Sequence, residues 1–158
     1  MSCGVALAIS LLLSDPNVAL AAAQPPAVAD APISVAAEPL FAGIVQHSGQ
    51  LKGVVDGWIA AGHADHADFW GGAEFSAFKT QAADLAASDL QGHLILKARG
   101  TDGDLKCILR GISEDMPKKV EAIEAAATPA ARRVALDELS YLLNDNVEVI
   151  TAPPAPEV

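Results

Sequence analysis

The sequence predicts an all-α protein, an up-down four-helix bundle flanked by disordered Ala/Pro-rich N- and C-terminal segments. Apolar residues recur at steps of three and four in successive stretches, which is the spacing of a helix face turned toward a core. Glycine- and proline-containing breaks separate these stretches. We expect helices near residues 39–62, 73–99, 102–127 and 129–144, with short connections that make neighbours antiparallel.

The third of these helices has the clearest pattern and start signal. Thr101 and Asp104 resemble a capping box, in which side chains satisfy the first backbone N–H groups of a helix. Pro117 interrupts the run, so either the helix kinks there or a second helix restarts with Ser113 or Asp115 as its N-cap. The apolar stripe keeps its phase across Pro117, which favours a kink. The stripe consists of Leu105, Ile108, Leu109, Ile112, Met116, Val120 and Ile123.

The fourth helix has signals at both ends. Thr128 and Pro129 form a favoured pair of N-cap and first-turn proline. The run 144–146, Asn-Asp-Asn, indicates a helix stop, and 147–150 is then expected to be extended. The apolar face comprises Ala131, Val134, Ala135, Leu139, Leu142 and Leu143.

The first two helices rest on similar stripes. The first contains Phe41, Ile44, Leu51, Val54, Val55, Trp58 and Ile59, and the second Phe75, Phe78, Ala82, Leu85, Ala86 and Leu90. Residues 93–110 are also compatible with a β-hairpin around an Asp-Gly turn, but adjacent Ile108 and Leu109 break the alternation of a strand and favour a helix. We expect a core that includes Leu51, Trp58, Phe78, Leu85, Leu109, Ile112, Ile123 and Leu139.

The first residues are typical of a secretory signal peptide. An apolar run from Val5 to Leu13 is followed by a break and by a small-x-small pattern, which predicts cleavage near Ala21 or Ala23. The segment carries no Lys or Arg, unlike most leaders. We divide the chain into a signal peptide (1–23), an Ala/Pro-rich linker (24–38), a bundle domain (39–150) and a Pro-rich tail (151–158), and expect a periplasmic or secreted protein without a transmembrane anchor after cleavage.

Composition argues against several classes of function. The net charge is −10 with only 10 Lys and Arg residues, which argues against nucleic-acid binding because phosphate contacts need clustered cations. The serines lack the Gly-x-Ser-x-Gly setting of a hydrolase, and there is no glycine-rich phosphate loop. We therefore expect a protein that is not an enzyme.

One cluster has the residue types of a metal site. His63, Asp65, His66 and Asp68 follow one another in a predicted connection, and imidazole and carboxylate groups could bind Zn²⁺ or Cu²⁺. Without a further histidine or cysteine nearby, the same cluster is compatible with a hydrated loop.

A second candidate site would lie inside the bundle. His47 and His93 fall on apolar stripes, and Met116 lies on a third stripe, so together they could bind haem or a metal between helices. Because Cys-x-x-Cys-His is absent, such a haem would be non-covalent. The alternative is that each histidine bonds to a carbonyl group or water.

Two features indicate possible contacts with a protein partner. Cys107 would be the single cysteine left after loss of Cys3 with the signal peptide, and it lies away from the core stripe. Gly49, Gly53 and Gly57 line one side of the first helix, which would allow close approach of a second copy or form a plain exposed face. We expect a structural or interaction module of the cell envelope, with a metal-ion or haem carrier or sensor as the alternative.

Overall fold

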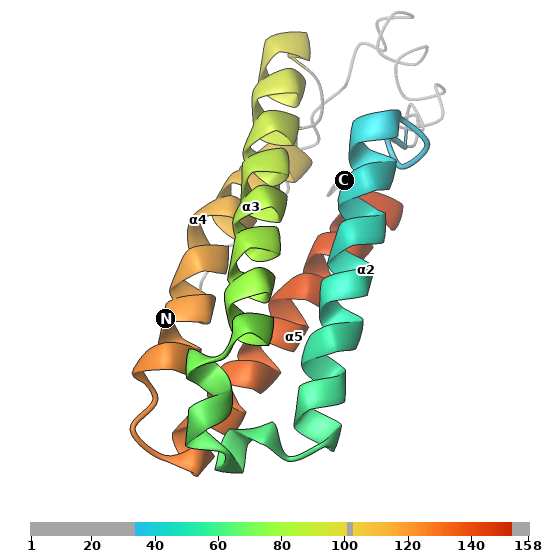
Figure 1. Ribbon diagram of the computed structural model, residues 1–158. Coiled ribbons are helices and arrows are strands. Elements are labelled where there is room, and N and C mark those ends of the chain that lie inside the picture. The colour runs from blue at the N-terminus through green and yellow to red at the C-terminus, as the bar shows by residue number, and fades with distance from the viewer. Residues whose placement is uncertain (1–33, 101–102, 153–158) are drawn as a thin grey trace, which may run out of the picture. The chain divides into compact units, whose positions relative to one another are not determined.

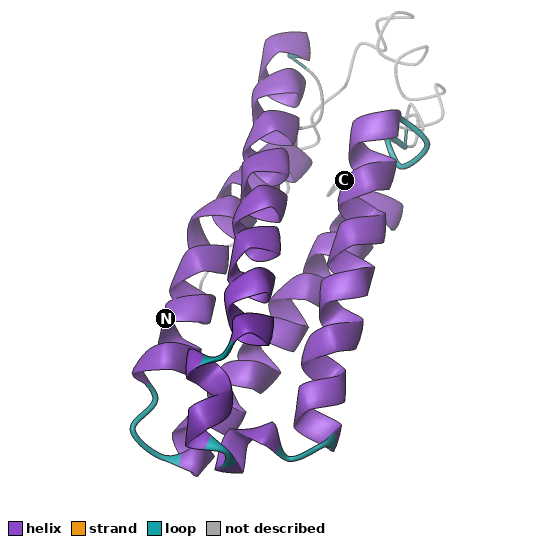
Figure 2. Cartoon of the chain, in the orientation of Figure 1, coloured by secondary structure: helices purple, strands orange, loops and turns teal. Residues whose placement is uncertain are grey.

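The computed structural model describes residues 34–100 and 103–152, and the observations below concern these residues. The predicted leader, most of the linker, the tail from residue 153 and the capping residue Thr101 lie outside them. Within the described part the chain forms four long helices, and Figure 2 shows them joined by loops and short helical turns, without a strand among the described residues.

The element order is simple. Helix α2 (Pro39–Ala60) leads through the short 3₁₀ helices η1 (His63–Asp65) and η2 (Ala67–Gly71) into α3 (Ala73–Arg99). Helices α4 (Gly103–Ala125) and α5 (Pro129–Thr151) follow. Each helix packs antiparallel against the next, and α5 packs against α2, so the four close into a bundle (Figure 1). The predicted fold class is confirmed.

Local signals explain where the helices begin and end. Helix α2 begins with Pro39. Helix α3 ends at Arg99 and is capped by Gly100, whose φ of 67° lies in the left-handed region that glycine adopts without strain. At the start of α5, Thr128 accepts a hydrogen bond from the Ala131 amide at 3.2 Å, as its predicted cap role requires. Helix α4 runs through Pro117 without a second start, so the single-helix interpretation is confirmed.

One local expectation was confirmed and one was wrong. Residues 93–99 and 103–110 are helical, as preferred, so the hairpin alternative is excluded. Helix α5 does not stop at 144–146 but continues to Thr151, because Asn146 is buried and hydrogen-bonded to two other helices. Contacts between helices therefore override the local preference of Asn and Asp for a helix end.

The core lies where the stripes predicted it. Each of the eight side chains expected to be buried is at most 4 % exposed: Leu51, Trp58, Phe78, Leu85, Leu109, Ile112, Ile123 and Leu139. Some stripe members lie on the surface instead, among them Val54 and Leu90, and Val134 is 56 % exposed. Val35, just before α2, is also buried against this core.

Candidate functional site

Three polar side chains are fully buried in the interior of the bundle. Ser48 of α2, Asp89 of α3 and Asn146 of α5 each have 0 % exposure. The Asn146 side-chain nitrogen Nδ2 lies 3.1 and 3.0 Å from the two carboxylate oxygens of Asp89 and 3.0 Å from Ser48 Oγ. We call these three residues the polar layer. Because its amide N–H groups point at both neighbours, Asn146 connects three helices through one side chain.

The carboxyl group of Asp89 has an unusual electrostatic environment. Burial raises its pKa to about 7, and the hydrogen bond from Asn146 offsets only part of that rise. An ionised carboxylate away from water needs a cation or several donors to balance the lost hydration. Here an amide supplies the donors, so the group gains or loses its proton near neutral pH.

The polar layer is not completely satisfied. The Asn146 side-chain oxygen Oδ1 is buried and has no hydrogen-bond partner among the described residues. A buried acceptor without a donor costs about 1–3 kcal/mol. This acceptor belongs to the side chain that bonds to the ionisable Asp89. Among the described residues it is the one buried side-chain polar atom without a hydrogen-bond partner.

The three predicted interior site residues lie on different helices and have separate contacts. His93 is on α3, one turn beyond Asp89, and its Nδ1 lies 2.6 Å from the Lys106 carbonyl oxygen of α4. Since a carbonyl only accepts, Nδ1 carries the hydrogen and donates. His47 is half-buried on α2, and Met116 is fully buried on α4. No hydrogen bond or ring contact joins these three residues in the described structure, and the haem site stays a prediction.

The predicted metal cluster lies in the connection formed by η1 and η2. The rings of His63 and His66 are 6.1 Å apart, but His63 stacks on Phe69 at 4.1 Å. Asp65 lies 3.7 Å from Arg133 of α5, and Asp68 is exposed. Within residues 34–100 and 103–152, no three His, Cys, Asp or Glu side chains are grouped so that they could hold a metal ion. Metal binding by this cluster stays a prediction.

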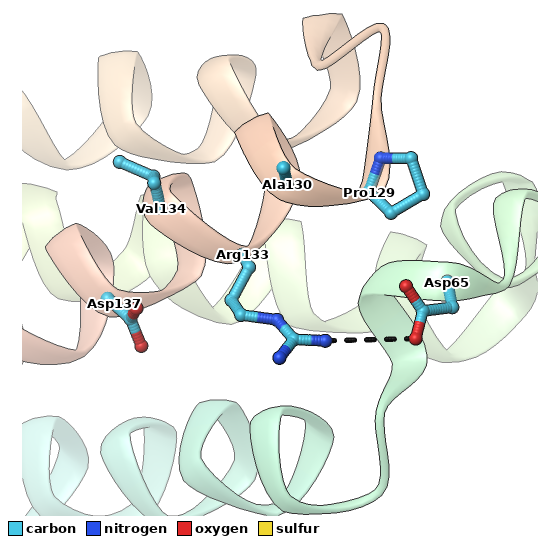
Figure 3. Close-up of a pocket in the computed structure, with 6 residues that line it drawn as sticks. All are labelled: Asp65, Pro129, Ala130, Arg133, Val134 and Asp137. Carbon is cyan, nitrogen blue, oxygen red and sulfur yellow. Dashed lines mark ion pairs between the residues drawn. The ribbon is translucent and has the colours of Figure 1, made fainter.

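Asp65 also borders a shallow surface depression beside the start of α5. Figure 3 shows its lining, with the ion pair between Asp65 and Arg133 at one side: Asp65, Pro129, Ala130, Arg133, Val134 and Asp137. Both charged partners are 57 % exposed, so water screens their attraction. The depression offers a surface contact and no enclosed chamber.

A buried cation holds this end of the bundle together. Arg132 of α5 is 9 % exposed and donates to the carbonyl oxygens of Ala64 (3.0 Å), Ala126 (2.7 Å) and Ile123 (3.4 Å). Its guanidinium also lies 5.7 Å from the ring centre of Trp70. Arg132 therefore ties the η1 turn and the end of α4 to the start of α5.

Aromatic side chains fill the space around this arginine contact. Trp58 is in edge-to-face contact with four rings at centroid distances between 4.8 and 5.9 Å, and its indole N–H donates to Glu74 at 2.9 Å. We call this group, together with Arg132, the aromatic end; its rings are Trp58, Phe69, Trp70, Phe75 and Phe78.

The predicted partner contacts lie on the surface. Cys107 is exposed and free. At Gly49, Gly53 and Gly57 an added Cβ would meet no atom of the described part of the chain within 4 Å, so those residues leave this face of α2 uncovered.

The sequence interpretation missed the polar layer and Arg132. A signal was nevertheless present, because Ser48 lies four residues after Ile44 and three before Leu51, a core position of the same stripe. Asp89 has the same relation to Leu85, and Arg132 precedes Leu139 by seven residues. Polar residues at stripe positions mark buried hydrogen-bonded groups.

Comparison with known proteins gives no match: no protein-family model, curated protein or solved structure is similar to this chain. No helix in the described ranges combines the length and the apolar character needed to span a bilayer.

Proposed function

We propose that this chain is a small exported helical-bundle protein of the cell envelope, acting as a non-enzymatic structural or interaction module. The proposal starts from the leader pattern of the first residues, Val5 to Leu13 followed by the small residues around Ala21. The acidic composition suits a soluble surface and disfavours nucleic acid as a partner.

The observation that carries the non-enzymatic part is the use made of the buried polar side chains. His93 bonds to a carbonyl of α4, Arg132 to three backbone carbonyls, and Asp89 to Asn146. Each of these contacts crosses from one element to another. Side chains that could perform chemistry elsewhere here hold helices together.

A partner would meet the outer surface of the bundle. Large apolar side chains exposed there include Tyr141 at 69 % and Leu94 at 54 %. A second copy of the chain could approach through Cys107 or along Gly49, Gly53 and Gly57, which have open space around them. Such close approach would need the small side chains to be kept.

Export is tested by fractionating cells that make the full chain and sequencing the N-terminus of the mature protein. The expected product is found outside the cytoplasm and begins after Ala21 or Ala23. A matched variant, Leu12→Asp, breaks the apolar run and should leave the protein in the cytoplasm. Uncleaved wild-type protein in the cytoplasm would contradict the proposal.

Metal analysis and absorption spectra distinguish the module from a carrier. Purified protein should contain no stoichiometric metal, show no Soret band and keep its spectrum on addition of Zn²⁺, Cu²⁺ or haem. Stoichiometric binding that is lost in a His63→Ala, His66→Ala variant would establish the metal carrier instead. Loss in a His47→Ala, His93→Ala variant would point to the interior site.

Self-association is tested by sedimentation with and without reductant. A dimer that dissociates in reductant and is absent in Cys107→Ser would assign the contact to the thiol. A dimer insensitive to reductant but lost in Gly53→Leu would assign it to the glycine face. A monomer under all conditions would remove the homodimer and leave a different protein as the partner.

A further inference from the structure

The polar layer joins three helices through a carboxyl group that water does not reach. Asp89, Asn146 and Ser48 have no exposed surface, and the three hydrogen-bond distances lie between 3.0 and 3.1 Å. We propose that this layer is a proton-sensitive switch, in which uptake of one proton by Asp89 strengthens the packing of α2, α3 and α5.

Among the residues that the structure describes, none places a cation against the Asp89 carboxylate. Nearby on its own helix is His93, which bonds to a backbone carbonyl. On α2, Lys52 is paired with Asp56 at 2.7 Å, and His47 is half-buried beside Ser48. Neither the histidines nor Lys52 is among the causes that move the pKa of Asp89, which are burial and the Asn146 hydrogen bond.

The described residues of helices α4 and α5 also supply no cationic partner for Asp89. Two contacts show which residues of α3 and α4 lie opposite each other: the ion pair between Lys79 and Glu124, and the close approach of Gly92 to Leu109. In this register the apolar Ile112 lies at the level of Asp89. The charged residues of α4 nearest in that register, Arg110 and Glu114, are exposed and form an ion pair with each other at 3.7 Å. On α5, Asp145 adjoins Asn146 and carries the same sign as Asp89.

The two protonation states use the hydrogen-bonding groups of the layer differently. In the ionised state both carboxylate oxygens accept from the Asn146 amide, and Asn146 Oδ1 is left without a donor. In the neutral state the carboxyl gains an O–H donor, and the layer offers Ser48 Oγ and Asn146 Oδ1 as acceptors. Protonation therefore removes a buried charge and adds one O–H donor to a layer that contains an acceptor without a partner among the described residues.

The sign of the effect follows from linkage. The folded protein binds the proton more tightly than the unfolded chain, because the pKa of Asp89 rises from 3.8 to about 7 on folding. The unfolding equilibrium constant should then increase by about tenfold per pH unit from about pH 4 to about pH 7 and level off above. Stability from this group is fully present at about pH 4 and is lost progressively as the pH rises to about 7.

The test is urea unfolding of the full chain between pH 4.5 and 8.5. The wild-type unfolding constant should rise on the order of a hundredfold over this range. In Asp89→Asn the rise should disappear, because the site no longer titrates. Asp84→Asn changes an exposed carboxylate of the same helix, and Asp145→Asn removes the neighbour whose pKa burial also raises; both should keep most of the wild-type rise.

Two further variants test the role of Asp89 and of its hydrogen-bond donor Asn146. Asp89→Leu tests the same loss of titration with an apolar side chain if the asparagine variant does not fold. Asn146→Leu removes the donor of the ionised state, so its unfolding constant should exceed that of wild type more at pH 8 than at pH 5. A flat wild-type profile, or an unchanged rise in the Asp89 variants, would overturn the switch.

Discussion

The aromatic end and the polar layer both bury polar groups, but they compensate them differently. At the aromatic end the Arg132 guanidinium has three carbonyl acceptors and an aromatic neighbour. In the polar layer the Asp89 carboxylate has the donors of a single amide, and that amide leaves its own oxygen unpaired. Backbone carbonyls stay acceptors at every pH, whereas a carboxyl changes between donor and acceptor.

This difference predicts two kinds of stability in one bundle. The aromatic end combines large apolar surfaces with a cation that keeps its charge, so its contribution should be independent of pH near neutrality. The polar layer contributes according to whether Asp89 holds its proton. Pairing specific polar groups across three helices also fixes their register, since sliding one helix would leave the others unpaired.

The largest effect is expected when a second acid is introduced at the level of the polar layer. Ile112 is 4 % exposed and lies at the level of Asp89 in the register of α3 and α4, so Ile112→Asp would bury an unpaired charge in the core. We expect circular dichroism to show an unfolded chain at pH 8. Ile112→Val, the control, should fold and lose about 0.5–1.5 kcal/mol. A folded, stable Ile112→Asp protein would remove α4 from the core.

The next largest effect is expected at the aromatic end. Trp58→Ala deletes the ring that contacts four others and should lower the free energy of unfolding by about 3–5 kcal/mol. Trp58→Phe keeps much of the ring contact and loses the bond to Glu74, so its loss should be clearly smaller. Urea unfolding measures both, and equal losses would show that packing around Trp58 is not what holds this end.

Arg132 allows a comparison with its exposed neighbour. Arg132→Met leaves three carbonyls without their donor, and a loss of about 2–3 kcal/mol is expected. Arg133→Met removes a guanidinium whose partner is 3.7 Å away and which is 57 % exposed, so the change should stay within about 0.5 kcal/mol. Similar losses in the two variants would contradict a special role for the buried arginine.

The smallest effects separate the interior from the glycine face. In Gly92→Ala the new Cβ would lie 3.1 Å from Leu109 and 3.2 Å from Phe41, so crowding should lower stability by about 1–2 kcal/mol. Gly53→Ala meets nothing within 4 Å and should raise stability by about 0.5–1 kcal/mol through helix propensity. Thermal unfolding compares them, and a stabilising Gly92→Ala would mean that α3 can move away from α2 and α4.

The sequence predicted the helices and the apolar core because both follow from local periodicity. Leu51, Ile112 and Leu139 are buried for the reason that predicted them, their place on one helix face. The predicted end of α5 was wrong because it rested on the local preference of asparagine for a helix end. The partners of Asn146, Ser48 and Asp89, are distant in sequence. Such pairings depend on how the helices are arranged, which periodicity does not encode.

The candidate site was less predictable than the fold. His63 and His93 were predicted as candidate ligands. In the structure His63 stacks on Phe69, and His93 is hydrogen-bonded to a backbone carbonyl. The carboxyl that titrates near neutrality, Asp89, has nothing distinctive in its neighbours along the chain. Its position on the core stripe was the one feature of the sequence that indicated burial. The raised pKa could not be predicted from that position, because it depends on which residues of the other helices cover the carboxyl group.

The measurement that tests the contrast most directly is a carbon-13 NMR titration of the Asp89 carboxyl group in the folded wild-type protein. We expect a midpoint of about 7 for this carboxyl and, in the same titration, a lowered pKa for Asp56, which accepts hydrogen bonds from Lys52 and Ser140. A midpoint for Asp89 near 4, the range of an exposed aspartate, would show that the buried layer accommodates the charge without cost.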